Sequence, residues 1–142
     1  MKISFFIGGT PQGKAVVRRG PRGVFFTDKK SRDYMEAIRK IARESYPGEK
    51  MGGAVTLEIV AYFKPPASTS KRVVANLLGK PFMSRPDADN ISKGICDALS
   101  PRKGDEWGIW DNDSQVFKLT VTKLYDENEG VRVNIENESM SK

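Results

Sequence analysis

Histidine is absent from this chain of 142 residues, and cysteine occurs only once, as Cys96. The absence of imidazole excludes the side chain that most often acts as a general base or metal ligand near neutral pH. A single thiol excludes an internal disulfide and any zinc site built from several cysteines. Cys96 lies in a segment with a helical pattern, so we expect it to pack as a small apolar residue rather than to react.

Long hydrophobic runs are also missing. No stretch approaches the roughly 18 apolar residues of a membrane-spanning helix. The apolar segment at 3–7 is followed by Gly8 and Gly9, and it is shorter than the core of roughly seven to fifteen residues found in a signal peptide. It therefore predicts a first β-strand that enters a turn, and we expect the protein to stay in the cytoplasm.

Negative charge is in deficit, with 18 Asp and Glu against 24 Lys and Arg and a formal net charge of +6. A basic surface attracts polyanions by neutralising phosphates and releasing their counterions. This balance indicates a nucleic-acid partner, although it also serves solubility alone. Aromatic residues make up only 9% of the chain and are scattered, so the stacking platform of many RNA-binding domains is poorly supplied.

Several basic residues lie in polar segments that have room to follow a DNA backbone. Lys14, Arg18, Arg19 and Arg22 occupy a glycine-containing segment that we predict to be a loop. Lys71 and Arg72 lie in the polar connection at 67–83. The candidates for phosphate contacts are Lys14, Arg18, Arg19, Arg22, Lys71 and Arg72. Neutralising phosphates is one role for them, and forming a solvated surface is the alternative.

Hydrophobic periodicity predicts helices and strands in succession. The expected helices cover 28–45 and 89–100, with a short one around 72–78, and the expected strands cover 3–7, 55–63, 116–124 and 131–135. We predict that the last two strands form a C-terminal hairpin around the turn at 126–130. A hydrophobic content of 38% in 142 residues suits one core. The predicted fold is a single α+β domain with helices packed on a mixed β-sheet.

Two pairs of aspartates have the same spacing. Asp87 and Asp89 follow a proline and precede the predicted helix at 89–100, while Asp111 and Asp113 precede a predicted strand. In an extended chain, residues i and i+2 point the same way, so each pair could face one hard cation such as Mg²⁺. The alternatives are helix capping for the first pair and turn formation for the second.

Helical geometry adds Lys93 to the first pair. On a helix that begins near Asp89, residues 89, 93 and 97 are successive i, i+4 neighbours on the face opposite the apolar stripe. Lys93 then lies between two carboxylates on the solvent side. It could stabilise the charge of an attacked phosphate beside a metal site, or it could belong to an ordinary surface ion-pair ladder.

These residues carry a family resemblance. The segment from Asp87 to Leu99 reads Asp-x-Asp-Asn-x-x-Lys-x-x-x-Asp-Ala-Leu, and Asp113-x-Gln-Val116 follows it before a strand that ends in Lys123. Together with the N-terminal Gly-x-Pro, the basic segment and a helix containing tyrosine, this pattern resembles the RusA family of Holliday-junction resolvases. The resemblance covers nearly the whole chain.

The resemblance implies an activity and assigns roles to residues. It implies an endodeoxyribonuclease that uses Mg²⁺, or Mn²⁺ in its place, and acts as a homodimer on four-way or branched DNA, with no membrane and no small-molecule cofactor. By resemblance, Asp87, Asp89 and Asp113 are the metal-binding carboxylates, Lys93 is the catalytic lysine, and Asp97 has a structural or secondary role. Without histidine, a metal ion would have to activate the attacking water. The rival interpretation is a branched-DNA-binding module without catalysis.

The sequence departs from the common family pattern at two places. Where many relatives have adjacent aspartates, this chain has Asn112 and Asp113, with Asp111 one position earlier, so the pattern leaves open which acid assists Asp113. The segment at 101–110, predicted to be a loop, is also longer than is usual in the family.

Overall fold

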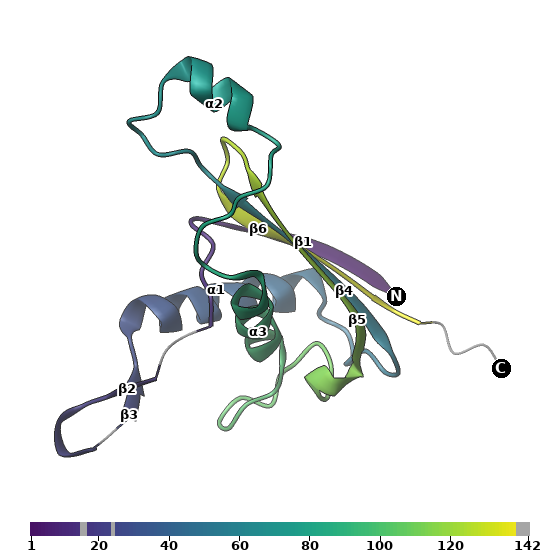
Figure 1. Cartoon of the computed structure of the whole chain (residues 1–142). Coiled ribbons are helices and arrows are strands. Elements are labelled where there is room, and N and C mark those ends of the chain that lie inside the picture. The colour runs from purple at the N-terminus through teal and green to yellow at the C-terminus, as the bar shows by residue number, and fades with distance from the viewer. Residues whose placement is uncertain (15–16, 24, 139–142) are drawn as a thin grey trace.

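A mixed four-stranded sheet forms the centre of the molecule (Figure 1). The computed structural model describes residues 1–14, 17–23 and 25–138. The sheet consists of β1 (Lys2–Gly8), β4 (Val55–Phe63), β5 (Val116–Tyr125) and β6 (Gly130–Asn137) in the order β1-β6-β4-β5. Strands β4 and β5 run parallel, whereas β6 is antiparallel to both of its neighbours, β1 and β4. The predicted α+β fold on a mixed sheet is confirmed.

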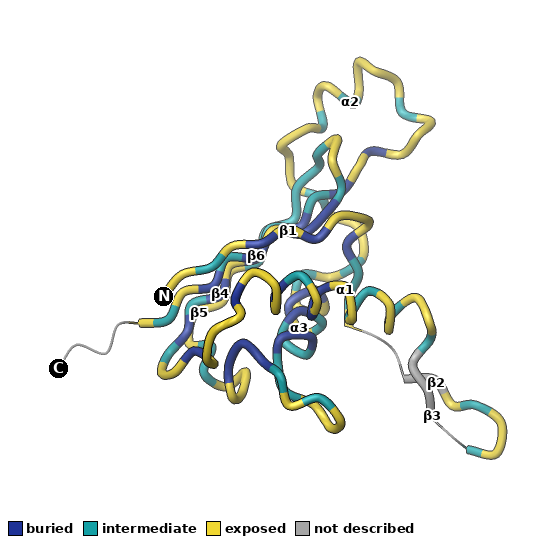
Figure 2. The backbone as a smooth tube through the Cα atoms, turned by 180° about the vertical axis from the view of Figure 1, so that it is seen from behind, coloured by how far each residue is buried: buried dark blue, intermediate teal, exposed yellow. Residues whose placement is uncertain are grey.

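Two helices cover one face of this sheet, α1 (Lys29–Ser45) and α3 (Ala88–Leu99). Figure 2 shows the buried side of both helices turned toward the strands. The remaining elements lie outside these two layers: the ribbon of β2 (Val17–Arg19) and β3 (Phe25–Thr27), the short helix α2 (Lys71–Leu77), and two 3-10 turns, η1 (Pro21–Gly23) and η2 (Asp113–Gln115). No helix in the described ranges combines the length and apolar character that crossing a membrane requires.

The core follows from the alternation predicted for the central strand. Every second residue of β4, from Val55 to Phe63, has an exposed fraction of 3% or less, and the side chains between them point to the open face. Ile38 and Ala42 of α1 and Ile91 and Ile95 of α3 are buried in the same hydrophobic core as these strand residues. Burying one such large side chain stabilises the fold by about 1.5–3 kcal/mol. The apolar side chains on the sheet-facing sides of α1 and α3 therefore keep both helices on the sheet.

The helix boundaries follow local capping chemistry. Asp28 caps α1 by accepting a hydrogen bond from the Ser31 N–H at 2.8 Å. Ser70 caps α2 in the same way, and that helix begins at Lys71, one residue before its predicted start. Carboxylate and hydroxyl oxygens at this position satisfy N–H groups that have no partner inside the helix. The basic segment predicted as a loop instead contains the β2–β3 ribbon, whose strands of three residues are too short to show a periodicity.

The predicted C-terminal hairpin is wrong. Strands β5 and β6 do not pair with each other, because β4 lies between them and pairs with both. The connection at 126–129 has the length of a hairpin loop. However, four residues can span up to about 14 Å, which exceeds the roughly 10 Å across two strand spacings. Alternation identified both strands, but it carried no information on which strand stands beside which.

Candidate active site

The first pair of predicted ligands lies at the N-terminus of α3. Asp87 is the N-cap residue of this helix, yet its side chain makes no capping hydrogen bond, and Asp89 lies in the first turn. Both residues are exposed to solvent. The capping explanation for this pair therefore has no support at Asp87, whose carboxylate is available to other partners.

Lys93 lies one turn further along α3. Its Nζ is 3.7 Å from Oδ2 of Asp89, and both side chains are more than half exposed. Asp97, predicted to flank Lys93 on the other side, instead pairs with Lys14 at 3.4 Å. An exposed pair of this kind contributes about 0–1 kcal/mol to stability, so the Lys93 ammonium is not held by a strong interaction.

The segment that carries Lys14 lies along the exposed face of α3. The Lys14 N–H donates to the backbone oxygen of Asn90 at 2.9 Å. A Cβ at Gly13 would come within 3.1 Å of Asn90 Cβ, and one at Gly94 within 3.4 Å of the Lys14 backbone nitrogen. The two glycines thus allow the N-terminal segment to approach the helix closely, which places a lysine from a distant part of the sequence on the face that bears Asp97.

Lys123 fixes the chain that leads into α3. From the C-terminal part of β5, its Nζ donates to the backbone oxygens of Ser84 at 2.7 Å and Pro86 at 2.8 Å. The same ammonium lies 5.5 Å from the ring centre of Phe82, which stacks on Phe63 at 3.9 Å. The family pattern included Lys123 without assigning it a role. Its contacts identify it as a positioning residue, because they hold the residue directly before Asp87.

The second acidic pair lies at the opposite end of β5, in the turn that precedes the strand. Asn112 performs the capping there, since its side chain accepts from the Ser114 N–H at 2.8 Å. Asp111 pairs with Lys50 at 3.6 Å. Asp113, the first residue of η2, is exposed. The predicted turn chemistry is thus present, but Asn112 supplies it, and Asp113 is not required for it.

Gln115 ties this acidic turn to the rest of the sheet. Its Oε1 accepts hydrogen bonds from the N–H groups of Asp111 and Asn112 at 2.9 and 3.2 Å. Its Nε2 donates to the backbone oxygens of Met51 and Gly53, both at 2.9 Å. Sequence reasoning quoted Gln115 as part of a motif but missed its function. The capping-box spacing from Asn112 to Gln115 was the signal that could have revealed it.

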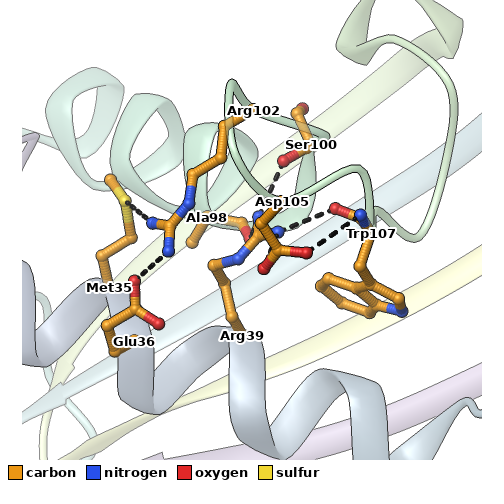
Figure 3. Close-up of polar contacts among 8 residues, drawn as sticks. All are labelled: Met35, Glu36, Arg39, Ala98, Ser100, Arg102, Asp105 and Trp107. Carbon is orange, nitrogen blue, oxygen red and sulfur yellow. Dashed lines mark hydrogen bonds and ion pairs between the residues drawn. The ribbon is translucent and has the colours of Figure 1, made fainter.

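Arg39 joins α1 to the end of α3 and to the loop that follows (Figure 3). Arg39 is 3% exposed, and its guanidinium donates to the backbone oxygens of Ala98, Ser100 and Trp107 at 2.7–2.9 Å. A fourth contact, at 2.9 Å, is an ion pair with Asp105. The hydrogen bond from Arg39, and then the one from the Trp107 backbone, hold the pKa of Asp105 below its usual range. These contacts therefore anchor the loop at 101–110, which directly precedes Asp111.

Cys96 has no features of a nucleophile. Burial, together with the negative charges of Asp113 and Asp97, raises the pKa of its thiol to about 12. The thiol therefore stays protonated near neutral pH, which agrees with the predicted packing role.

The five aspartates of the two predicted pairs and Asp97 thus form two groups. Asp97, Asp111 and Asp113 line one cavity of about 330 Å³ beneath the end of α3. Asp87 and Asp89 are not part of its lining, and along the helix axis Asp87 lies about 15 Å from Asp97 at 1.5 Å per residue. Within the described ranges, no three acidic, cysteine or histidine side chains come together in a way that could hold a metal ion. One chain therefore does not assemble the three predicted ligands.

The predicted DNA contacts are distributed over separate projections. Arg19 and Arg22 are exposed on the β2–β3 segment, and Lys71 and Arg72 are exposed on α2. The side chain of Arg18 lies outside the described part of the structure. Figure 1 shows the ribbon and α2 extending from different sides of the molecule. These basic residues thus lie on separate parts of the surface rather than in one patch.

Comparison with known proteins agrees with the motifs of α3 and η2. A family model described as "Endodeoxyribonuclease RusA" matches residues 8–136. The chain is also 30% identical over 138 residues to the "Uncharacterized protein YqaN" of Bacillus subtilis (strain 168), an alignment that covers 89% of this chain and 92% of that protein. The family match extends over both acidic groups and over the helix and loop between them, and the chain belongs to the RusA endodeoxyribonuclease family.

Proposed function

We propose that this protein is a Mg²⁺-dependent endodeoxyribonuclease that resolves Holliday junctions by paired symmetric nicks. The observation that carries this proposal is the start of α3, where Asp87, Asp89 and Lys93 are exposed together in a member of a DNA endonuclease family. A nuclease needs negative groups for a cation and a positive group for phosphate at an accessible surface. The start of α3 offers both within two helical turns.

The donor chemistry suits a hard cation. The proposed ligands are carboxylate oxygens alone, which Mg²⁺ prefers, and Mn²⁺ accepts the same donors. When bound, such an ion supplies positive charge and lowers the pKa of its water. The placement within one chain does not suit a three-carboxylate site, because Asp113 lies with Asp97 and not with Asp87. Asp87 and Asp89 are therefore the ligands that a single chain offers together.

The remaining roles belong to cationic side chains. In this proposal the Lys93 ammonium stabilises the negative charge that develops on the attacked phosphate, since its weak pairing with Asp89 leaves it accessible. Lys14, Arg19, Arg22, Lys71 and Arg72 contact flanking phosphates, and Arg18 is assigned to the same task from the sequence. A homodimer fits a four-way junction, because a two-fold axis relates two equivalent cuts. With DNA as substrate, the proposed place of action is the cytoplasm.

A substitution at Asp87 tests this function against the alternative of a non-catalytic DNA-binding module. Asp87→Asn keeps an N-cap residue of equal quality, but it removes the negative charge that a hard cation needs. We expect cleavage of a synthetic four-way junction to be lost, while circular dichroism and junction binding stay unchanged. EDTA should likewise stop cleavage by the unmodified protein.

The matched control is Asp33→Asn on α1. Asp33 is also an exposed aspartate, paired with Lys29 at 2.9 Å, but it lies outside the proposed site. This control should cleave normally. A folded Asp87→Asn variant that cleaves at the wild-type rate would favour the binding module and contradict the proposed ligand.

A further inference from the structure

We propose that Lys14 is a second cation of the candidate active site, that it contacts a different phosphate of the same DNA strand as Lys93, and that Asp97 is its positioning residue. This inference deepens the proposed nuclease function and rests on it for the ligand, the backbone of branched DNA. It also gives a task to Asp97, to which the family resemblance assigned only a structural or secondary role.

The first step is the anchoring of the segment that carries Lys14. Residues 9–14, which we call the strap, leave β1 after Gly8, a residue that pairs with β6. At the other end of the strap, the Lys14 N–H donates to the backbone oxygen of Asn90 on α3 at 2.9 Å. Pro11, between these two points, is buried. The strap is therefore fixed to the sheet at its start and to the helix at its end.

The second step is the close packing of the strap on the start of α3. A Cβ on Gly13 would lie 3.1 Å from Cβ of Asn90 and 3.4 Å from Cβ of Pro86, which directly precedes the first proposed ligand. A Cβ on Gly94 would lie 3.4 Å from the backbone nitrogen of Lys14. Because neither glycine carries a side chain, the strap lies directly on the helix that bears the proposed ligands.

The third step is the direction of the Lys14 side chain. Its Nζ is 3.4 Å from Oδ2 of Asp97, and about half of the side chain is exposed. At roughly 100° per residue around the helix axis, Asp97 lies between Asn90, on the strap side, and Lys93, on the other side. The Lys14 ammonium therefore lies at the edge of the solvent-facing side of α3 that bears Lys93.

The fourth step is the spacing of the two ammonium groups. Lys93 pairs with Asp89 at 3.7 Å, and Lys14 pairs with Asp97 at 3.4 Å. The two aspartates are eight residues apart, which corresponds to about 12 Å along the helix axis. Ammonium groups held at these two points suit two phosphates of one strand that follows the helix better than they suit a single phosphate.

The fifth step is the strength of the pair between Lys14 and Asp97. Both side chains are partly exposed, and exposed ion pairs are weak. A phosphate oxygen can therefore take the ammonium over from Asp97, or share it, and form a charge-assisted hydrogen bond. Until DNA binds, Asp97 keeps the ammonium on the helix face, which reduces the side-chain entropy that binding would otherwise cost.

Junctions with single neutral phosphates test this contact. Synthetic four-way junctions each carry one uncharged methylphosphonate linkage, at successive positions around the crossover, and fluorescence anisotropy measures binding in EDTA to prevent cleavage. We expect one position at which the substitution weakens wild-type binding about tenfold but does not weaken binding by Lys14→Gln. Lys93→Gln should identify a second position on the same strand, within a few nucleotides. The matched control, Lys29→Gln, removes the lysine of another exposed pair, with Asp33 at 2.9 Å, and should respond like the wild type at every position.

Variants of Asp97 separate positioning from a purely structural role. Asp97→Asn should leave the thermal unfolding temperature nearly unchanged, because an exposed pair is weak, but it should reduce the effect of the methylphosphonate that Lys14 senses. Asp97→Glu keeps the negative charge and should restore that effect. An equal or larger effect in Asp97→Asn than in the wild type would show that Asp97 only competes with the phosphate, and it would overturn the positioning role.

Cleavage kinetics in Mg²⁺ separate this inference from the proposed function. Lys14→Gln should raise KM about tenfold with kcat nearly unchanged, whereas Lys93→Gln should lower kcat. Equal losses of kcat in the two variants would place Lys14 on the attacked phosphate and overturn its assignment to a different one. If the wild type cleaves but Lys14→Gln senses every methylphosphonate as the wild type does, the Lys14 contact is overturned and the nuclease stands. If the wild type does not cleave but the Lys14 position is found in EDTA, the contact is supported and the nuclease is rejected.

Discussion

At the scale of single residues, the uncharged side chain of Gln115 fixes the acidic turn through hydrogen bonds. Its carboxamide makes four hydrogen bonds, two to the turn that carries Asp111 and two to the chain before β4. Each partner is a backbone group whose position depends on Gln115. The geometry of Asp113, one of the ligands expected from the sequence, therefore depends on a neutral neighbour two residues away.

We predict that Gln115→Leu, which keeps the approximate size of the side chain and removes its polar groups, lowers both stability and activity. Loss of the hydrogen bonds should destabilise the protein by about 1–3 kcal/mol, as measured by urea unfolding. Junction cleavage should fall by more than binding, because the acidic turn is displaced while the basic projections are unaffected. Gln115→Glu keeps the acceptors and loses the donors, so its stability should lie between those of the wild type and Gln115→Leu. An unchanged unfolding midpoint for Gln115→Leu would contradict this role.

Asp105 gives the protein a pH dependence at the same scale. Its pKa is lowered in the folded state by the hydrogen bonds from Arg39 and the Trp107 backbone. A carboxyl group with a lowered folded pKa stabilises the protein above its unfolded pKa, and that contribution is lost as the pH falls through the folded value. We predict that Asp105→Asn is less stable than the wild type at pH 7 and that the difference shrinks below about pH 4. Thermal unfolding at several pH values measures it; a constant difference would show that the Asp105 charge is not involved.

At the scale of secondary-structure elements, the sequence predicted what local chemistry determines. The helix at 28–45 and the strand at 55–63 were found with nearly correct ends, because the N-cap of Asp28 and the alternation of buried residues are local signals. The order of the strands was not found. Pairing of β4 with β5 depends on contacts between residues about sixty positions apart, and no alternation pattern contains that information.

The same limit applies to the acidic groups. Both pairs were identified from spacing, and both are exposed as an active site requires. Their distribution to the two ends of α3 follows from the direction of that helix over the sheet, which the sequence does not state. The assignment of Asp87, Asp89, Lys93 and Asp113 as site residues remains a prediction.

Arg39 is the residue on which the packing of these elements depends. It connects α1, the end of α3 and the loop at 101–110 through three backbone oxygens and Asp105. We predict that Arg39→Met destabilises the protein by at least about 1–3 kcal/mol, because it leaves backbone carbonyl groups without their donor. Chemical denaturation would measure this change.

Arg43 provides the control on the same helix. Its guanidinium also lies over the Trp107 ring, at 5.6 Å compared with 5.1 Å for Arg39, but it is exposed. Arg43→Met should cost less than about 1 kcal/mol. Similar losses for the two variants would mean that stacking on Trp107, and not the buried hydrogen bonds, is the larger effect.

At the scale of the whole molecule, exposed basic residues lie on elements that project from the body of the protein. The β2–β3 ribbon extends from the body of the protein on one side, and the N-terminus lies on another (Figures 1 and 2). Among the residues that the structure describes, this ribbon pairs only with itself and contributes no residue to the hydrophobic core. Its exposed arginines can therefore be changed without disturbing the sheet and helices, which makes DNA binding testable separately from folding.

Arg22 at the tip of this ribbon is suited to that test. Its backbone has a φ of 62°, a left-handed conformation that Asn tolerates better than most residues, so Arg22→Asn should leave stability unchanged or slightly raised. The charge is lost, and we predict weaker binding to junction and duplex DNA alike, because phosphate contacts carry no sequence information. The slope of log K against log salt should flatten by roughly 0.9 for each phosphate contact removed, as measured by fluorescence anisotropy at several salt concentrations. Lys2→Asn, on β1 far from the ribbon, removes the same charge and should leave the slope unchanged. Equal slopes for wild type and Arg22→Asn would show that the ribbon does not touch DNA, and equal losses for both variants would show that only net charge is sensed.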